Sequence, residues 1–152
     1  MSKVRDAVIL AGGAGTRMLP ASLLTPKEAM PLVDTPIINH LIWEAAKAGI
    51  TRVHLVLSEW KKNLLQGSLD GSNYFDIGVR PDLPPEALKL GLEGMEIIPH
   101  IQKEPGGVAD AISVAISQIR GAFLVLLGDM VILEDHVGPE FSGPEFASSA
   151  SL

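Results

Sequence analysis

Residues 10–20 read LAGGAGTRMLP and combine three glycines with one arginine in a loop-forming string. Glycine puts no side chain between the backbone and a ligand, so successive N–H groups can surround an anion. Arg17 adds a permanent cation with forked donors. The combination suits a triphosphate, although a glycine-rich turn alone is as typical of a tight turn after a strand.

Two familiar phosphate-binding motifs fit this string badly. A Walker A loop ends in Gly-Lys-Ser/Thr, whereas Gly15 is followed by Thr16 and Arg17. A dinucleotide fingerprint needs a small residue where Met18 stands and an acidic residue about 20 positions farther on. The glycines therefore indicate a different kind of nucleotide site.

Three further polar side chains could take part in phosphoryl chemistry. Lys27 lies in the proline-flanked string TPKEAMP, and fixed positive charge is what phosphoryl transfer mainly requires. The amide of Gln102 offers both a donor and an acceptor, which complements the N3–H and carbonyl of uracil or thymine. Asp129 follows an apolar run and Gly128, where a carboxylate could bind the Mg²⁺ that bridges phosphate oxygens.

The elements that must position these residues alternate between strands and helices along the chain. The apolar runs predict strands at Val4–Ala11, Arg52–Leu57, Met95–Gln102 and Phe123–Leu127, with a short extended piece at Met30–Val33. Helices are expected from Thr35-Pro36 to Gly49, at Glu59–Gln66 and at Val108–Ile119. This β-loop-α-β order predicts a parallel sheet with right-handed crossovers, which binds ligands at the carboxyl ends of its strands.

Helix boundaries and faces can be predicted in more detail. Thr35 is expected to be the N-cap of the first long helix, with Pro36 at its first position and Gly49 just after its end. Its apolar face is predicted to contain Ile37, Ile38, Leu41, Ile42, Ala45 and Ala46. The buried side of the later helix is predicted to contain Val108, Ile112, Ala115, Ile116 and Ile119.

Composition limits the remaining choices. The 152 residues are 47% hydrophobic with a formal net charge of -6, which fits one globular domain and disfavours nucleic acid as a partner. The apolar runs are far below the roughly 20 residues that cross a bilayer. With no signal-peptide pattern at the N-terminus, we expect a cytoplasmic protein without a membrane partner. The absence of cysteine excludes disulfides and thiolate metal sites, and the histidines, including His40 and His54, show no metal-site spacing.

The motifs together resemble the sugar-1-phosphate nucleotidyltransferase family. Its signature is GxGTRxxP, then PKxxxP, then a helix that starts with proline, and residues 10–20, 25–33 and 36–38 match it. The chain looks most like the bacterial-type glucose-1-phosphate uridylyltransferases in three short sequences: RMLP, PKE and, at 44–51, EAAKAGIT. The match is close from Val4 to about Leu57 and resumes at Gln102–Leu133.

The resemblance implies a role for each matched residue. Arg17 would stabilise the departing pyrophosphate, Lys27 would lie against the reacting phosphates, and Asp129 would bind Mg²⁺. Gln102 and Gly107 would read the base, and the triphosphate would lie on the loop residues Ala11, Gly12, Gly13, Gly15 and Thr16. The implied reaction is attack of glucose-1-phosphate on the α-phosphorus of UTP, which gives UDP-glucose and pyrophosphate. Residues 107–111, GVADA, also resemble the adenylyl-specific relatives, so thymidylyl and adenylyl transfer stay open.

The family fold implied is a three-layer α/β sandwich with a mostly parallel, Rossmann-like sheet. Residues 1–133 would form the N-terminal nucleotide-binding part, and 134–152 a loosely held tail. In the family a second metal-binding aspartate and much of the sugar pocket lie farther downstream than Leu152. A nucleotide-binding module without turnover and a purely structural remnant are therefore alternatives. Uncovered sheet edges and apolar helix faces predict a homo-oligomer.

Overall fold

The computed structural model describes residues 4–62 and 94–131. Within these ranges the main sheet has four parallel strands in the order β5-β4-β1-β6. The strands are β1 (Asp6–Leu10), β4 (Arg52–Ser58), β5 (Glu96–Gln102) and β6 (Phe123–Leu127). All four lie within a residue or two of the predicted strands. The predicted surface excursion at 67–94 and the predicted tail at 134–152 fall almost entirely outside the described residues.

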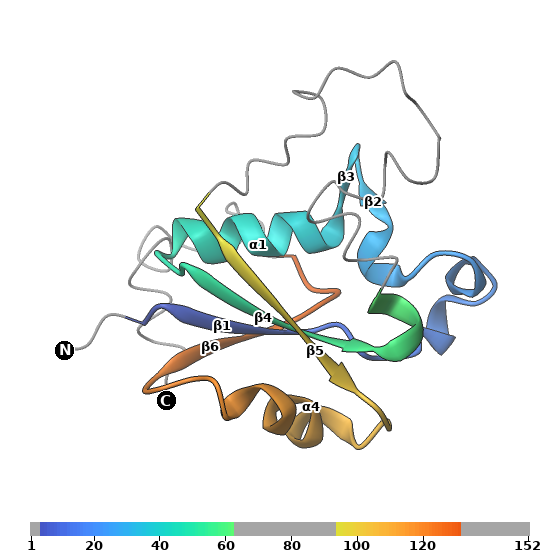
Figure 1. The fold of residues 1–152 in the computed structure, drawn as a ribbon. Coiled ribbons are helices and arrows are strands. Elements are labelled where there is room, and N and C mark those ends of the chain that lie inside the picture. The colour runs from blue at the N-terminus through green and yellow to red at the C-terminus, as the bar shows by residue number, and fades with distance from the viewer. Residues whose placement is uncertain (1–3, 63–93, 132–152) are drawn as a thin grey trace, which may run out of the picture.

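The sheet has a helix on each face (Figure 1). Helix α1 (Ile37–Lys47) covers one face and helix α4 (Gly107–Ile116) covers the other. Since β1 is central and pairs with both β4 and β6, its side chains alternate between the two layers. The predicted three-layer α/β architecture is confirmed.

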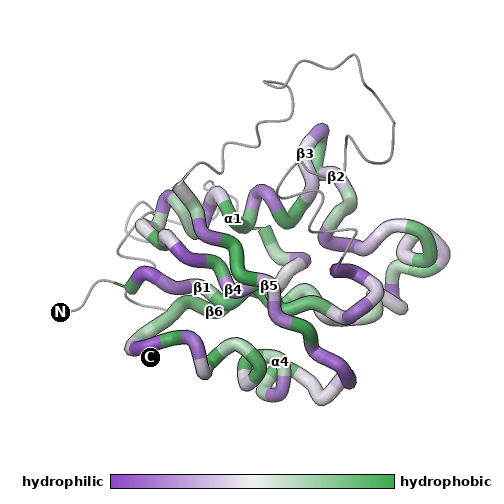
Figure 2. The backbone as a smooth tube through the Cα atoms, in the orientation of Figure 1, coloured by the Kyte–Doolittle hydropathy of each residue, from purple (hydrophilic) through white to green (hydrophobic). Residues whose placement is uncertain are grey.

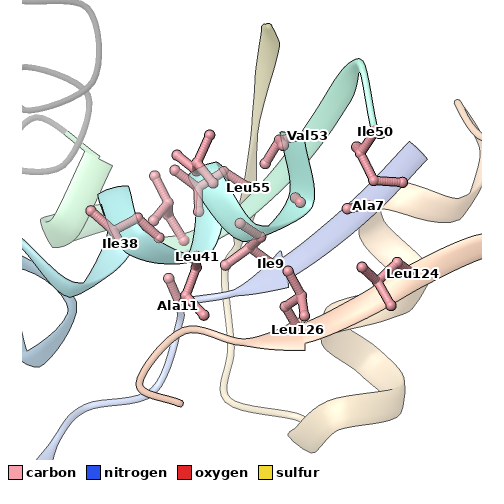
Figure 3. Close-up of a cluster of buried hydrophobic side chains, with 13 residues drawn as sticks. Ala7, Ile9, Ala11, Ile38, Leu41, Ile50, Val53, Leu55, Leu124 and Leu126 are labelled. Atoms are coloured by element: carbon pink, nitrogen blue, oxygen red, sulfur yellow. The ribbon is translucent and has the colours of Figure 1, made fainter. Parts of the chain in front are cut away.

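Two separate cores follow from this alternation. Ala7 and Ile9 of β1 pack with Leu41 of α1 in the larger core, which also contains residues of β4 and β6 (Figure 3). Val8, between them on the opposite face, packs with Val56 and the α4 side. Continuous apolar runs such as DAVIL are expected where both faces of a parallel strand are buried.

Helix α1 ends as predicted but begins differently. Gly49 has a φ of 84°, its N–H donates to the carbonyl of Ala46, and the N–H of Ile50 donates to the carbonyl of Ala45, which is a Schellman ending. The predicted N-cap was wrong. Thr35 belongs to the two-residue strand β3 (Thr35–Pro36), and its hydroxyl donates to Asp34 rather than to the helix.

The predicted faces of the helices were partly wrong. Ala46 of α1 is exposed, whereas Ile38, Leu41, Ile42 and Ala45 are buried. In α4, Val108 is 56% exposed and Ile116 is 49% exposed, and the buried residues are Ala111 and Ala115. Figure 2 shows hydrophobic residues gathered in α4 beside the sheet, so the helix is apolar around much of its surface and periodicity alone does not fix its buried side.

Short elements connect the main ones. Strand β2 (Pro31–Leu32) pairs antiparallel with β3, which places the predicted extended piece in a small hairpin. Three 3₁₀ turns precede it: η1 (Thr16–Met18), η2 (Ala21–Leu23) and η3 (Lys27–Ala29). The helix predicted from Glu59 begins as the 3₁₀ turn η4 (Glu59–Lys61), and residues 63–66 lie outside the described part. No helix among the described residues is long and apolar enough to span a membrane.

Candidate active site

All four parallel strands of the main sheet end at one edge, and the predicted site residues follow those ends. The glycine loop follows β1, Gln102 ends β5, and Asp129 follows β6 through Gly128. Lys27 reaches the same edge from η3. The structure thus brings together residues from four separate segments, as expected of an open α/β sheet.

The glycine loop is held by its own neighbours. The N–H of Ala11 donates to the carbonyl of Val56, 2.8 Å away, which extends the β1–β4 pairing into the start of the loop. Gly15 has a φ of 70°, which favours glycine, and its carbonyl accepts a 2.7 Å hydrogen bond from the Ser22 hydroxyl. Gly13, Thr16 and Arg17 are exposed, so the loop presents backbone and one cation to solvent.

A buried lysine lies under the loop. The ammonium of Lys61 donates to the carbonyl oxygens of Ala11 and Gly13, at 2.9 and 2.5 Å. It also donates to both carboxylate oxygens of Glu28, at 3.0 and 2.9 Å. The side chains of Lys61 and Glu28 are 1% and 0% exposed. This pair ties the glycine loop to η3, and therefore fixes Lys27 relative to the loop.

Lys27 and Asp129 form the exposed counterpart of this buried pair. The ammonium of Lys27 lies 2.5 Å from Oδ2 of Asp129, with side chains 17% and 43% exposed. The hydrogen bond from Lys27 lowers the pKa of Asp129 below its ordinary value, which keeps the carboxylate ionised. Asp129 and Lys27 thus form an ion pair beside the glycine loop.

Asp129 is placed by a close approach of two backbones. The N–H of Gly128 donates to the carbonyl of Leu10, 2.9 Å away. A Cβ at Gly128 would lie 2.7 Å from that oxygen and 3.2 Å from Cα of Ala11, so only glycine fits. Asp129 therefore leaves the sheet directly beside the glycine loop.

Gln102 lies at the other side of the loop, near the start of α4. Its amide nitrogen donates to the carbonyl of Gly107, at 3.3 Å, and to Oδ2 of Asp110, at 2.6 Å. A Cβ on Gly12 would lie 2.9 Å from Oε1 of Gln102, so the amide oxygen faces the loop. The predicted base-reading pair is thus adjacent to the predicted phosphate loop.

Sequence reasoning missed Glu28, Lys61 and Asp110. Signals for the first two existed: Glu28 directly follows Lys27, and Lys61 lies three residues beyond β4, at the strand end where sites form. Asp110 carried a weaker signal, because an acidic residue in the first turn of a helix has an ordinary explanation in the helix dipole.

A second polar cluster begins at the opposite end of the sheet, at Asp6 and Arg52. Arg52 donates to both carboxylate oxygens of Asp6, at 2.7 and 2.9 Å, and the buried His54 bridges Asp6 and His100. Asp6 raises the pKa of Arg52, mainly through the hydrogen bond. Burial, followed by repulsion from His54, lowers the pKa of His100. The cluster extends along β4 from Asp6 and Arg52 to His100, two residues before Gln102 on β5, and ties β1, β4 and β5 together.

Comparison with known proteins gives one consistent family. The chain is 37% identical over 137 residues to UTP–glucose-1-phosphate uridylyltransferase YngB of Bacillus subtilis, covering 88% of this chain and 46% of that protein. The structure is similar to UDP-glucose pyrophosphorylase from Acinetobacter baumannii, with a TM-score of 0.71 and 30% identity over 86% of this chain and 47% of that one. The UTP-bound enzyme of that organism gives a TM-score of 0.66, also at 30% identity and with the same coverage of both chains.

The chain spans about half the length of the curated relatives it matches. The family model described as nucleotidyl transferase matches residues 6–139, which contain every residue of the site at the sheet edge. The chain therefore belongs to the nucleotidyl transferase family.

Proposed function

We propose that this chain carries the nucleotide half of a uridylyltransferase site, which transfers a uridylyl group from UTP to glucose-1-phosphate and releases pyrophosphate. The observation that carries the proposal is the contact of Lys27 with Asp129 beside the glycine loop. A cation, a carboxylate and a loop of accessible N–H groups are the parts that phosphoryl transfer needs in one place. The names of the curated relatives support UTP and glucose-1-phosphate as the substrates.

Each site residue has a role in this proposal. Backbone N–H groups of Gly12, Gly13, Gly15 and Thr16 bind the triphosphate, and Ala11 leads the chain into the loop. Arg17 holds the pyrophosphate as negative charge develops on it, and Lys27 neutralises the reacting phosphates. Attack by the sugar-phosphate oxygen on the α-phosphorus displaces pyrophosphate directly, so no covalent enzyme intermediate is needed.

Mg²⁺ is the proposed cofactor, with Asp129 as its ligand on this chain. The carboxylate fits a hard cation because it is ionised, 43% exposed and already in contact with the ammonium of Lys27. Bound Mg²⁺ would supply charge neutralisation between phosphate oxygens. With Asp129 holding the metal ion, the ammonium of Lys27 would be available to the phosphates.

Isothermal titration calorimetry of the chain with UTP, in the presence of Mg²⁺, tests the proposal. We expect saturable binding that Arg17→Gln weakens by about tenfold, the size of one charged contact to phosphate. The Lys103→Gln variant is the matched control, because Lys103 is an exposed cation next to the site but outside the loop. A folded chain that binds no nucleoside triphosphate would contradict the proposal.

The second candidate is a nucleotide-binding module without turnover. It would use the same glycine loop and Gln102 to hold the nucleotide. Saturable Mg·UTP binding without pyrophosphate release would identify it. Thymidylyl or adenylyl transfer would be identified instead by tighter binding of dTTP or ATP than of UTP.

We also propose that the chain self-associates. Val125 and Leu127 of β6 are 38% and 42% exposed, on the side of the sheet where α4 covers β1, β4 and β5. Among the described residues β6 is an edge strand, and apolar side chains on such a strand are typical of a contact surface. Light scattering after size-exclusion chromatography should give a mass above 16.1 kDa, and a monodisperse monomer would contradict this part.

A further inference from the structure

The amide of Gln102 is held in one orientation by two neighbours that can only accept hydrogen bonds. The first is the carboxylate of Asp110, whose Oδ2 lies 2.6 Å from Nε2, and the second is the carbonyl of Gly107, at 3.3 Å. A glutamine amide turned the other way would put its oxygen against these two oxygens. The nitrogen must therefore face Asp110 and Gly107.

The orientation of the nitrogen also fixes the amide oxygen, Oε1, on the opposite side of the Gln102 amide. Oε1 faces the glycine loop, since a Cβ at Gly12 would be 2.9 Å from it. Gln102 is 9% exposed, so the side chain has little room to change rotamer. On the loop side Gln102 thus presents its acceptor, Oε1, while its donor, Nε2, faces Asp110 and Gly107.

Asp110 is itself placed by a specific feature of the backbone. Its carboxylate folds back over Gly106, where a Cβ would lie 2.6 Å from Cγ and 2.8 Å from Oδ2 of Asp110. Any side chain at 106 would push the carboxylate away from Gln102. Its position in the first turn of α4 also places negative charge where the helix dipole favours it.

We propose that Asp110 is a specificity-determining residue, which fixes the amide of Gln102 so that the site selects a base with an N–H at the position facing Oε1. This inference rests on the proposed function, in which Gln102 reads the base of UTP. Uracil carries a hydrogen on N3, whereas N3 of cytosine is a lone pair that would face the fixed oxygen. Asp110 thereby excludes cytosine without touching the base.

The test is the ratio of the dissociation constants of CTP and UTP, measured by calorimetry with Mg²⁺ on the 152-residue chain. Asp110→Asn keeps the size of the side chain but replaces the carboxylate with an amide. This amide can donate or accept, so the amide of Gln102 is no longer held in one orientation. Gly106→Ala displaces the carboxylate without changing any charge. Both variants should lower the CTP-to-UTP ratio by about tenfold, the scale of one mispaired buried group.

Glu104→Gln is the matched control, since it removes one negative charge from the same loop without a contact to Gln102. It should keep the wild-type ratio even if all triphosphates bind more tightly. Circular dichroism and thermal unfolding should first be used to check that each variant is folded. Two-dimensional NMR of side-chain amides gives a second readout, because the Gln102 NH₂ resonances should shift in both Asp110→Asn and Gly106→Ala.

The outcomes separate this inference from the proposed function. Wild-type selectivity for UTP that is unchanged in Asp110→Asn and Gly106→Ala overturns the inference and leaves uridylyl transfer standing. A reduced ratio in both variants supports the inference, even if the chain releases no pyrophosphate. A wild-type chain that binds UTP and CTP equally overturns the role of Asp110, and one that binds neither overturns both.

Discussion

The ammonium of Lys27 and the carboxylate of Asp129, 102 positions apart in the sequence, are in direct contact at the end of β6. Both residues come from segments that the fold brings to one sheet edge. Under the proposed function, Lys27 and Mg²⁺ would compete for the same carboxylate. Asp129 would hold the metal ion, and Lys27 would then be available to neutralise the phosphates.

Lys27→Met should therefore strengthen the binding of Mg²⁺ to the nucleotide-free chain, while it weakens the binding of Mg·UTP. The first effect should be about fivefold, the Coulomb scale for unit charges a few ångströms apart in a solvated site. Calorimetric titration with MgCl₂ checks it. Lys103→Met is the control, and equal Mg²⁺ affinities in wild type and Lys27→Met would contradict the competition.

Lys61→Met should be strongly destabilising, because it removes the hydrogen-bonded partner of the buried Glu28 carboxylate and leaves only the Lys27 ammonium, 3.9 Å from Oε1. Removing one member of a buried ion pair costs about 3–5 kcal/mol. Denaturant unfolding measures the change, with Lys62→Met as the control at the next position. The double variant Lys61→Met/Glu28→Met should recover part of the loss, since no buried charge then remains.

A double variant as unstable as Lys61→Met alone would show that the pair acts through the loop carbonyls rather than through Glu28. The hydrogen bonds from Lys61 to Ala11 and Gly13 are lost in both variants. The comparison thus separates the ion pair from the loop contacts.

Two glycines near the site should respond differently to a methyl group. Gly128→Ala forces a Cβ to within 2.7 Å of the carbonyl of Leu10, so it should destabilise the fold by about 1–3 kcal/mol. Gly13→Ala meets no atom within 4 Å and should change the unfolding free energy by less than about 0.5 kcal/mol. It should still weaken UTP binding if the loop N–H groups approach the phosphates. Equal stability losses in the two variants would contradict the close approach at Gly128.

Stability should fall at acid pH because of His100. Burial lowers the pKa of His100 in the folded state below its ordinary value of 6.5, so the unfolded state binds the proton more readily. The contribution is therefore complete above pH 6.5 and is lost as the pH falls through 6.5 toward the folded-state pKa. Unfolding free energies measured from pH 8 to pH 5 should decline, and His100→Gln should flatten the decline. A slope unchanged by the substitution would contradict the assignment.

Much of this fold could be predicted because the strands are largely apolar runs, and those of β1 and β6 lead into glycines. Phe123–Leu127 was predicted to the residue, since the apolar run leads directly into Gly128. The N-cap at Thr35 could not be predicted correctly, because the small hairpin of β2 and β3 takes that residue into a strand pair. Only a contact between neighbouring segments determines this.

The residues of the site were predicted from motifs, whereas their support was not. Lys27 and Asp129 belong to recognisable strings, so their types and positions pointed to phosphate chemistry. Lys61 acts through buried contacts to Ala11, Gly13 and Glu28, and its position just beyond β4 does not by itself indicate these partners. The link from Asp110 to Gln102 likewise depends on the turn at Gly106 rather than on spacing alone.

The most direct test of the account is Mg²⁺-dependent pyrophosphate release from UTP in the presence of glucose-1-phosphate, with Asp129→Asn measured beside the wild type. Both proteins must first be shown to be folded by circular dichroism. The account predicts release of pyrophosphate and formation of UDP-glucose by the wild type, with a loss of at least about 100-fold in Asp129→Asn, since a metal contact to the reacting phosphates is removed. Folded wild-type protein that binds Mg·UTP but releases no pyrophosphate, or an Asp129→Asn variant as active as the wild type, would contradict it.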